Sequence, residues 1–148
     1  MRFLVLLGAT ALLAGVLGCP TPTPTPPAEA VLAGTWSLVP EQELVPALEN
    51  WTLSFDADGN LSQISYKFAG VAQVTLNDPP GATNVTGNDA FISATIQGSG
   101  FQFSGPFNSD KTRIDGTLSS NLVVGGATVT VDRGAASLTK TSPTAVPL

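Results

Sequence analysis

The chain lacks the side chains on which most enzyme chemistry depends. Its 148 residues include no histidine and a single cysteine, Cys19. Without histidine, the Ser–His–Asp and Cys–His catalytic arrangements and all imidazole metal sites are excluded. One cysteine can form neither an internal disulfide nor a zinc site built from several thiolates. We therefore expect no catalytic residues, no metal site and no cofactor, and we predict that the protein is not an enzyme.

Charge is also scarce, and its sign is mostly negative. Charged residues make up 11% of the chain, with six basic against eleven acidic residues and a net charge of −5. Loss of an N-terminal segment containing Arg2 would leave five basic against eleven acidic residues, a net charge of −6. An acidic surface disfavours nucleic acid and anionic lipid headgroups as partners.

The N-terminus carries the longest apolar run. Met1 and Arg2 form a short positive region, and Phe3 to Leu17 is interrupted only by Gly8, Thr10 and Gly15. As a helix, this run would reach about 22 Å at 1.5 Å per residue, short of the ~30 Å hydrocarbon core of a bilayer. It therefore predicts a secretory signal peptide and not a transmembrane helix.

The run ends in Val16-Leu17-Gly18-Cys19, which resembles the lipobox of bacterial lipoproteins. The resemblance implies cleavage before Cys19, which then carries a thioether-linked diacylglycerol and an N-acyl chain such as palmitate. Two acyl chains suffice for stable membrane anchoring. Pro20 stands where an aspartate commonly marks inner-membrane retention in Gram-negative bacteria, so the outer membrane is preferred, with the domain in the periplasm or elsewhere in the cell envelope.

Two alternatives to lipidation stay open. Ala28-Glu29-Ala30 matches the pattern of ordinary signal cleavage, which would release a soluble protein. Cys19 could also be an unmodified cysteine at the end of the apolar run.

The domain organisation follows from composition. We expect a signal peptide over residues 1–18, lipidated Cys19 with a Pro/Thr-rich linker over 19–30, a β domain over 31–140 and a C-terminal tail over 141–148. Alternating Pro and Thr favours an extended polyproline II spacer at ~3.1 Å per residue.

From residue 31 onward, apolar and polar residues alternate. Trp51, Leu53 and Phe55 alternate with Thr52 and Ser54, as in a strand with one buried face. The same period marks strands around Ile64–Phe68, Val74–Leu76, Ile92–Ile96, Phe101–Phe103, Ile114–Leu118, Leu122–Val124 and Val129–Val131, with turn signals at Asp56–Asn60, Asn77–Gly81, Gly87–Asp89, Gly98–Gly100, Asn108–Asp110, Gly125–Gly126 and Asp132–Gly134.

This pattern predicts an all-β antiparallel meander of about 8–10 short strands, forming an up-and-down β-barrel or, alternatively, a β-sandwich. Only Pro40 to Asn50 does not fit a strand. That segment could form a turn of helix carrying Leu44, Val45 and Leu48.

Gly34-Thr35-Trp36 resembles the Gly-x-Trp of the first strand in the lipocalin and wider calycin families, and Leu32 to Trp36 is similar to the first strand of avidin. The resemblance implies a barrel with Trp36 closing its bottom and the loop from Pro40 to Asn50 partly covering its mouth. It also implies a basic residue packed over Trp36, for which Arg133 is the candidate. The Thr-Asp-Tyr motif of lipocalins is absent.

The resemblance implies a small apolar ligand in the barrel interior. The candidate lining residues are Trp36, Trp51, Phe55, Tyr66, Phe68 and Phe103. The function we predict is that of a lipid-anchored lipoprotein outside the cytoplasm that binds such a ligand. The alternative is a structural or interaction domain without a ligand cavity, which would contact another envelope protein. The interior volume would distinguish the two.

Three further motifs have simpler interpretations than chemistry. Asp56-Ala-Asp58-Gly-Asn60 is similar to the start of a calcium loop but lacks its later ligands, so we expect a hairpin turn, with a weak cation site as the alternative. Ser137 and Lys140 match the S-x-x-K spacing of penicillin-binding enzymes, but in a strand they point to opposite faces. The loop acids Glu41, Glu43 and Glu49 fit a solvated segment better than glycoside hydrolysis.

Overall fold

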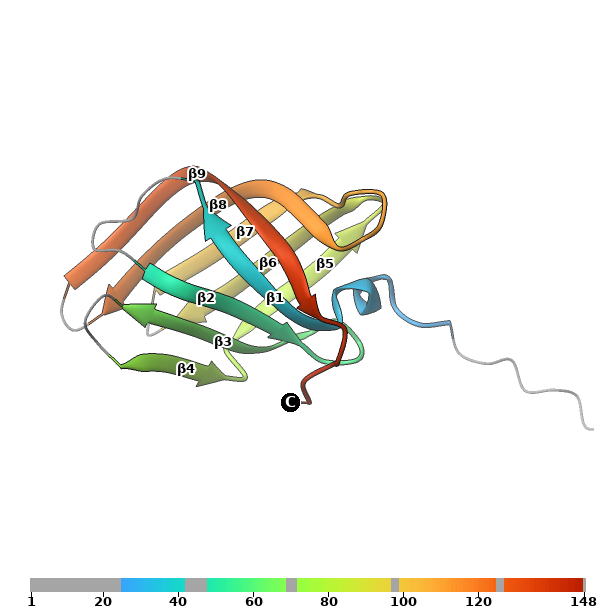
Figure 1. Ribbon diagram of the computed structural model, residues 1–148, viewed down its shortest axis with the longest axis horizontal. Coiled ribbons are helices and arrows are strands. Elements are labelled where there is room, and N and C mark those ends of the chain that lie inside the picture. Colours follow the sequence, from blue (N-terminus) through green and yellow to red (C-terminus); the bar gives the residue numbers. More distant parts are fainter. Residues whose placement is uncertain (1–24, 42–47, 69–71, 97–98, 125–126, 148) are drawn as a thin grey trace, which may run out of the picture.

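The computed structural model describes residues 25–41, 48–68, 72–96, 99–124 and 127–147. Within these residues, one short 3-10 helix is followed by nine strands: η1 (Ala28–Leu32), β1 (Gly34–Pro40), β2 (Leu48–Phe55), β3 (Leu61–Phe68), β4 (Gln73–Asn77), β5 (Gly81–Thr86), β6 (Asp89–Ile96), β7 (Ser99–Pro106), β8 (Arg113–Val124) and β9 (Ala127–Ser142). They form one sheet in the order β4-β3-β2-β1-β9-β8-β7-β6-β5, which curls round on itself (Figure 1). The predicted antiparallel up-and-down meander is therefore confirmed.

The first and last strands close the meander. β1 pairs with β2 on one side, where Trp36 lies opposite Leu53, and with β9 on the other, where Trp36 lies opposite Lys140. All the other pairings join strands that are consecutive in sequence. The N-terminal and C-terminal strands therefore lie side by side in the middle of the sheet, and its two ends are β4 and β5.

β4 and β5 act as one strand bent in two. Every pairing in the sheet is antiparallel, so the eight steps from β4 to β5 leave these two strands running in the same direction. Only residues 78–80 join them, and parallel neighbours need a connection of about a dozen residues or more. β5 therefore continues the course of β4, which pairs with β3, and itself pairs with β6.

The bend has a local cause in Asp78-Pro79-Pro80. Asp78 has a positive φ of 46°, and its N–H donates the last hydrogen bond to the β3 side, to the carbonyl of Ser62 at 2.8 Å. The two prolines have no N–H to donate. The carbonyl of Pro80 then accepts a hydrogen bond from Thr95 in β6 at 2.7 Å. The chain thus passes from one neighbour to the other within three residues.

Helix η1 covers the outer edge of β5. The N–H of Val85 in β5 donates to Glu29 Oε1 of η1 at 3.3 Å. Thr83 Oγ1 of the same strand donates at 2.9 Å to the carbonyl of Gly59, in the turn between β2 and β3. Covering an edge in this way removes unpaired backbone groups that would otherwise recruit another strand. Ala28 to Ala30, which the sequence places in the linker, therefore form part of η1 and contact the domain.

The interior is a single hydrophobic core. The inward residues of the strands form one buried cluster, to which η1 adds Leu32. The strongest alternation is on β6, where Ala90, Ile92, Ala94 and Ile96 are buried between exposed or half-buried neighbours. The sequence period of two thus reflects one face turned inward.

Three local expectations differ from the structure. β5 was not expected, because its side chains are exposed or half-buried and carry no apolar alternation. Asp132 to Gly134 does not form a turn. The segment lies within β9, where the register with β8 shifts between Leu118 and Ser120, as at a β-bulge. Leu48 begins β2 and is not in a helical turn, while residues 42–47 lie outside the described part.

Candidate ligand site in the barrel interior

Trp36 closes one end of the barrel with its polar atom satisfied. Its side chain is fully buried, and its Nε1 donates to the carbonyl of Leu32 in η1 at 2.6 Å. Its ring lies 6.3 Å from that of Phe107, edge to face. Lys140 Nζ lies 4.9 Å from the Trp36 ring centroid and donates to the carbonyl of Val31 at 2.9 Å. Helix η1 and Trp36 thus plug this end.

The structure places Lys140 as a basic residue over Trp36. Lys140 follows from the pairing of β1 with β9, in which it is the register partner of Trp36. Desolvation lowers the pKa of its ammonium group below the ordinary value. The side chain of Arg133 lies outside the described part of the structure.

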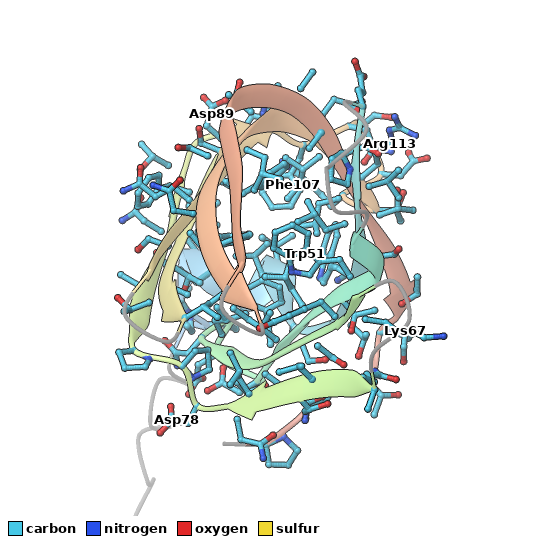
Figure 2. All side chains as sticks on the ribbon, turned by 90° about the vertical axis from the view of Figure 1, so that its left-hand side faces the viewer. Trp51, Lys67, Asp78, Asp89, Phe107 and Arg113 are labelled. Atoms are coloured by element: carbon cyan, nitrogen blue, oxygen red, sulfur yellow. The ribbon has the colours of Figure 1, made fainter. Side chains whose placement is uncertain are left out.

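A second group of aromatic residues lies elsewhere in the interior. Trp51 in β2 is 6.4 Å from Tyr66 in β3 and 5.5 Å from Phe101 in β7, measured between ring centroids. Because β2 and β7 are four positions apart in the strand order, the Trp51–Phe101 contact crosses the barrel. Figure 2 shows Trp51 enclosed by the curled sheet. Trp51 is 2% exposed, and Tyr66 and Phe101 are 0% exposed.

Two polar atoms of this group have no hydrogen-bond partner among the described residues. They are Trp51 Nε1 and the Tyr66 hydroxyl. A buried polar group without a partner costs about 1–3 kcal/mol, so native interiors rarely keep one. Burial raises the pKa of Tyr66 above its ordinary value, so its hydroxyl stays protonated and able to donate.

The predicted lining residues are placed as follows. Trp36, Trp51, Phe55, Tyr66 and Phe103 are all buried in the core, and the side chain of Phe68 lies outside the described part. Of these, Trp51 and Tyr66 are brought together. Phe101 was missed as a site residue, although it alternates with Gln102 in the same way as Phe103.

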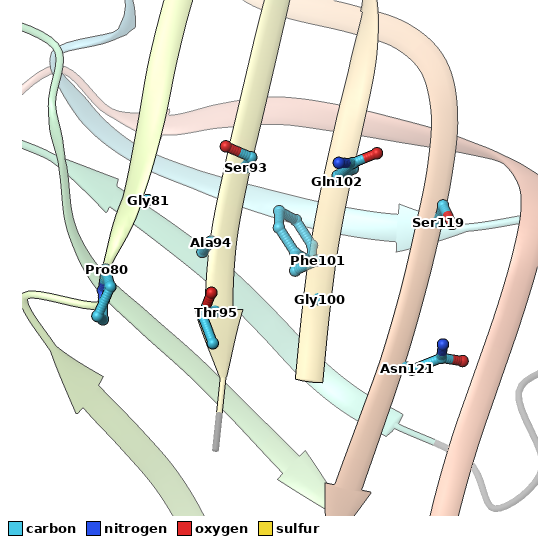
Figure 3. Close-up of a pocket in the computed structure, with 10 residues that line it drawn as sticks. All are labelled: Pro80, Gly81, Ser93, Ala94, Thr95, Gly100, Phe101, Gln102, Ser119 and Asn121. Carbon is cyan, nitrogen blue, oxygen red and sulfur yellow. The ribbon is translucent and has the colours of Figure 1, made fainter. Parts of the chain in front are cut away.

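Two concavities are lined by described residues, and neither is lined by Trp51 or Tyr66. A groove of about 380 Å³ runs over β5 to β8 on the outer face, where Ser93, Thr95, Gln102, Ser119 and Asn121 present uncharged polar groups (Figure 3). A smaller one, of about 230 Å³, lies at the bend between β4 and β5, beside Asn60 and Leu61.

Asp56 is used by its own turn. Its carboxylate accepts the N–H of Asp58 at 2.9 Å, the N–H of Asn60 at 2.8 Å and the side-chain amide of Asn60 at 3.0 Å. Burial acts to raise the pKa of Asp56, but these hydrogen bonds outweigh it and the pKa is lowered. The segment is thus the hairpin turn between β2 and β3, and within the described ranges no three His, Cys, Asp or Glu side chains cluster as metal ligands.

The other two motifs do not assemble a site. Ser137 and Lys140 both lie in β9, and Lys140 is engaged with Trp36 and Val31. Glu41 is exposed, Glu43 lies outside the described residues, and so does the side chain of Glu49 in β2. Among the residues that the structure describes, no helix has the length and apolarity needed to cross a bilayer.

Comparison with known proteins gives the chain no relative. No family model matches it, and neither the curated proteins nor the solved structures gave a match.

Proposed function

We propose that this protein is a lipid-anchored lipoprotein of the cell envelope whose calycin-like barrel binds a small apolar ligand beside Trp51. The contrast between the two tryptophans carries the proposal. Trp36 donates its indole N–H to Leu32, whereas Trp51, equally buried, has no acceptor among the described residues and lies against Tyr66, which has none either.

The anchor is Cys19, and η1 supports cleavage at that residue. Cleavage after Ala30 would cut through η1 and remove Glu29, which caps the edge of β5. Cleavage before Cys19 leaves η1 whole. The Pro/Thr composition of residues 20–27 favours an extended spacer, which at ~3.1 Å per residue would reach about 25 Å.

The anchor is tested with Cys19→Ala. We expect this variant to lose lipid labelling and to move from the membrane pellet to the supernatant, because no other side chain of the chain can accept the thioether. Fractionation without detergent measures this, with the unsubstituted protein as control. A variant that still pellets with membranes would contradict the anchor.

Ligand binding is tested with two variants that each keep one tryptophan. In Trp36→Phe, the emission comes from Trp51, and in Trp51→Phe it comes from Trp36. A long-chain apolar ligand should shift the emission of Trp51 saturably and leave that of Trp36 unchanged, since Trp36 is sealed beneath η1. Equal responses, or none, would contradict an interior site beside Trp51.

The second candidate function is an interaction domain of the envelope, and the outer groove favours it. The groove crosses four strands and presents amide and hydroxyl groups. Phe91, which does not line the groove but lies on the same face of β6 as Ser93 and Thr95, is 40% exposed. Under this alternative, Gln102→Lys should abolish capture of an envelope partner without changing the fluorescence response to apolar ligand. The reverse result supports the interior site.

A further inference from the structure

We propose that the outer groove over β5 to β8 binds an uncharged oligosaccharide through the side chains of Gln102 and Asn121. The polar side chains of this groove point outward, whereas Trp51 lies in the core. The site is therefore separate from the interior and goes beyond the function proposed above. A protein partner, to which the second candidate function assigns the same groove, becomes an outcome of the test.

Gln102 is the longest polar side chain that lines the groove. It is exposed on β7, with Ser93 of β6 as its register partner on one side and Ser119 of β8 on the other. The three residues form a row across the strands (Figure 3). The hydroxyl of Ser93 donates to the carbonyl of Ala82 at 3.3 Å, and no hydrogen bond within the described residues engages the amide of Gln102. Both the donor and the acceptor of that amide are therefore available to a ligand.

Outward polar residues on the other half of the sheet bond to one another instead. Gln63 of β3 and Asn77 of β4 are register partners, and the Gln63 amide donates to Asn77 Oδ1 at 2.8 Å. Ser65 and Thr75, also register partners, have their hydroxyl oxygens 3.2 Å apart. Alignment of polar side chains in register thus leads to pairing between β3 and β4 but not at Gln102. This difference points to the groove as the part of the outer face whose polar groups serve a ligand.

A hollow beside this row comes from Gly100 of β7. Gly100 is the register partner of Thr95, and a Cβ on Gly100 would meet nothing within 4 Å. Asn121 of β8 lies on the other side of Gly100 and is exposed (Figure 3). The groove has a volume of about 380 Å³, within the ~300–1,000 Å³ of small-molecule pockets. The smaller concavity at the bend shares Pro80 and Gly81 with it, so the two adjoin and together can hold more than one sugar ring.

The chemistry of the lining favours a sugar over a charged ligand or a peptide. Amide and hydroxyl side chains both donate and accept hydrogen bonds, as the hydroxyl groups of a sugar do. None of the described residues that line the groove is charged, so a charged ligand would gain no ion pair there. An extended peptide binds a sheet by adding a strand to a free edge, whereas β6 and β7 are paired on both sides.

Phe91 provides an apolar contact next to the groove. It lies on the same face of β6 as Ser93, two residues earlier and so about 7 Å along the strand. Its side chain is 40% exposed. The face of a phenyl ring carries partial negative charge, which attracts the C–H groups on the flat side of a sugar ring. One ring of an oligosaccharide can therefore stack on Phe91 while its neighbour occupies the groove.

Calorimetric titration with three tetrasaccharides tests the site. Cellotetraose and tetra-N-acetylchitotetraose are neutral, and tetragalacturonic acid is anionic at neutral pH. The protein is the chain from residue 19 onward carrying Cys19→Ala, so that no detergent is needed. We expect at least one neutral tetrasaccharide to bind and the anionic one to bind more weakly, because the described lining offers no counter-charge and the chain is acidic.

Three variants locate the sugar. Gln102→Ala should weaken binding about fivefold, the value of one neutral hydrogen bond. Gly100→Val should abolish binding without lowering the unfolding midpoint, because its side chain fills the open hollow and valine favours strands. Gln63→Ala is the matched control, since it removes the same side chain from a position paired with Asn77, and it should leave sugar binding unchanged.

Several outcomes overturn the inference. Failure of both neutral tetrasaccharides to bind does so, as does tightest binding of the anionic one. Equal weakening by Gln102→Ala and Gln63→Ala, or unchanged affinity in Gly100→Val, places the sugar outside the groove. Loss of capture of an envelope protein in Gln102→Lys, with no sugar bound by the unsubstituted chain, assigns the groove to a protein partner.

The function proposed above is measured separately, by the emission of Trp51 with a long-chain apolar ligand in Trp36→Phe. A Trp51 response without sugar binding overturns only the oligosaccharide site. Sugar binding without a Trp51 response supports the oligosaccharide site and contradicts only the interior site.

Discussion

At the scale of single residues, the two tryptophans are both buried but differ in whether the indole N–H has a hydrogen-bond acceptor. Trp36 has three described contacts: a hydrogen bond to the carbonyl of Leu32, the ammonium group of Lys140 and the ring of Phe107. Trp51 packs in the buried core against the rings of Tyr66 and Phe101, and its indole N–H has no acceptor among the described residues. Both tryptophans belong to the buried core, but only Trp36 has a hydrogen-bond partner among the described residues.

Replacement of Trp36 tests its place in the buried core. Truncation of a buried aromatic to alanine costs about 3–5 kcal/mol, and small domains hold only ~5–15 kcal/mol, so Trp36→Ala should bring the protein close to unfolding. Thr52→Ala is the control. Thr52 follows the buried Trp51 on the opposite, half-buried face of β2, and its truncation should cost well under about 1 kcal/mol. Chemical denaturation measures both, and equal midpoints would contradict the assignment of the inner face.

The turn carboxylate of Asp56 should make stability depend on pH. Its folded-state pKa is lowered, so its contribution is complete above the unfolded value of about 3.9 and is lost as the pH falls through the folded value. In Asp56→Asn, the free energy of unfolding should fall less steeply at acid pH, because the contribution of the Asp56 carboxylate is absent. Denaturation at a series of pH values from neutral to acid measures this. Parallel curves for the two proteins would show that Asp56 has no such role.

How far the site could be predicted depends on the range of the interactions involved. The inward direction of Trp51 and Tyr66 follows from local alternation, and both were predicted. Lys140 was not expected over Trp36, because its place there is set by the register of β1 against β9, a pairing across most of the chain. The missing partners of Trp51 and Tyr66 depend on packing across the barrel, which no local pattern reports.

At the scale of elements, the bend between β4 and β5 is a feature that the sequence did not predict. Asp78-Pro79-Pro80-Gly81 has the composition of a hairpin turn. The sequence of β5 lacks the alternation of apolar and polar residues that would predict a strand. The two strands are nevertheless not paired with each other. The strands with buried apolar faces, such as β2, β3, β6 and β7, were predicted because their alternation is a local property.

The attachment of η1 can be tested at Gly59. This glycine has a φ of +87°, and a Cβ there would lie 1.9 Å from the carbonyl oxygen of Glu29. Gly87 also has a positive φ, of +62°, but a Cβ there would meet nothing within 4 Å. Gly87→Ala should therefore lower the free energy of unfolding by the backbone strain alone, roughly 1–2 kcal/mol. Gly59→Ala should lower it further, because η1 must move.

The measurement has two parts. The unfolding midpoint should be highest for the unsubstituted protein, lower for Gly87→Ala and lowest for Gly59→Ala. Hydrogen exchange of the Val85 amide should accelerate only in Gly59→Ala, since that amide donates to Glu29. Equal exchange in the two variants would show that η1 does not depend on the space at Gly59.

At the scale of the whole molecule, the described core is one cluster that contains both tryptophans. A single core predicts one cooperative transition. In the variants Trp36→Phe and Trp51→Phe, the tryptophan that is left should therefore report the same midpoint as circular dichroism of the strands. A fluorescence transition that precedes loss of strand signal in either variant would show that its end of the barrel unfolds separately.

The pairing of β1 with β9 has a consequence for the order of assembly. Thr141 Oγ1 in β9 donates to the carbonyl of Thr35 in β1, 106 residues earlier. During synthesis, β1 therefore cannot complete its pairing until β9 has been made. Until the C-terminal strand has emerged, β1 offers a bare edge on the side that β9 will take. Contacts so distant in sequence also make folding slow. A chain of this topology reaches its folded form only after β9 has been synthesised, so until then β1 has to be kept from pairing with other chains.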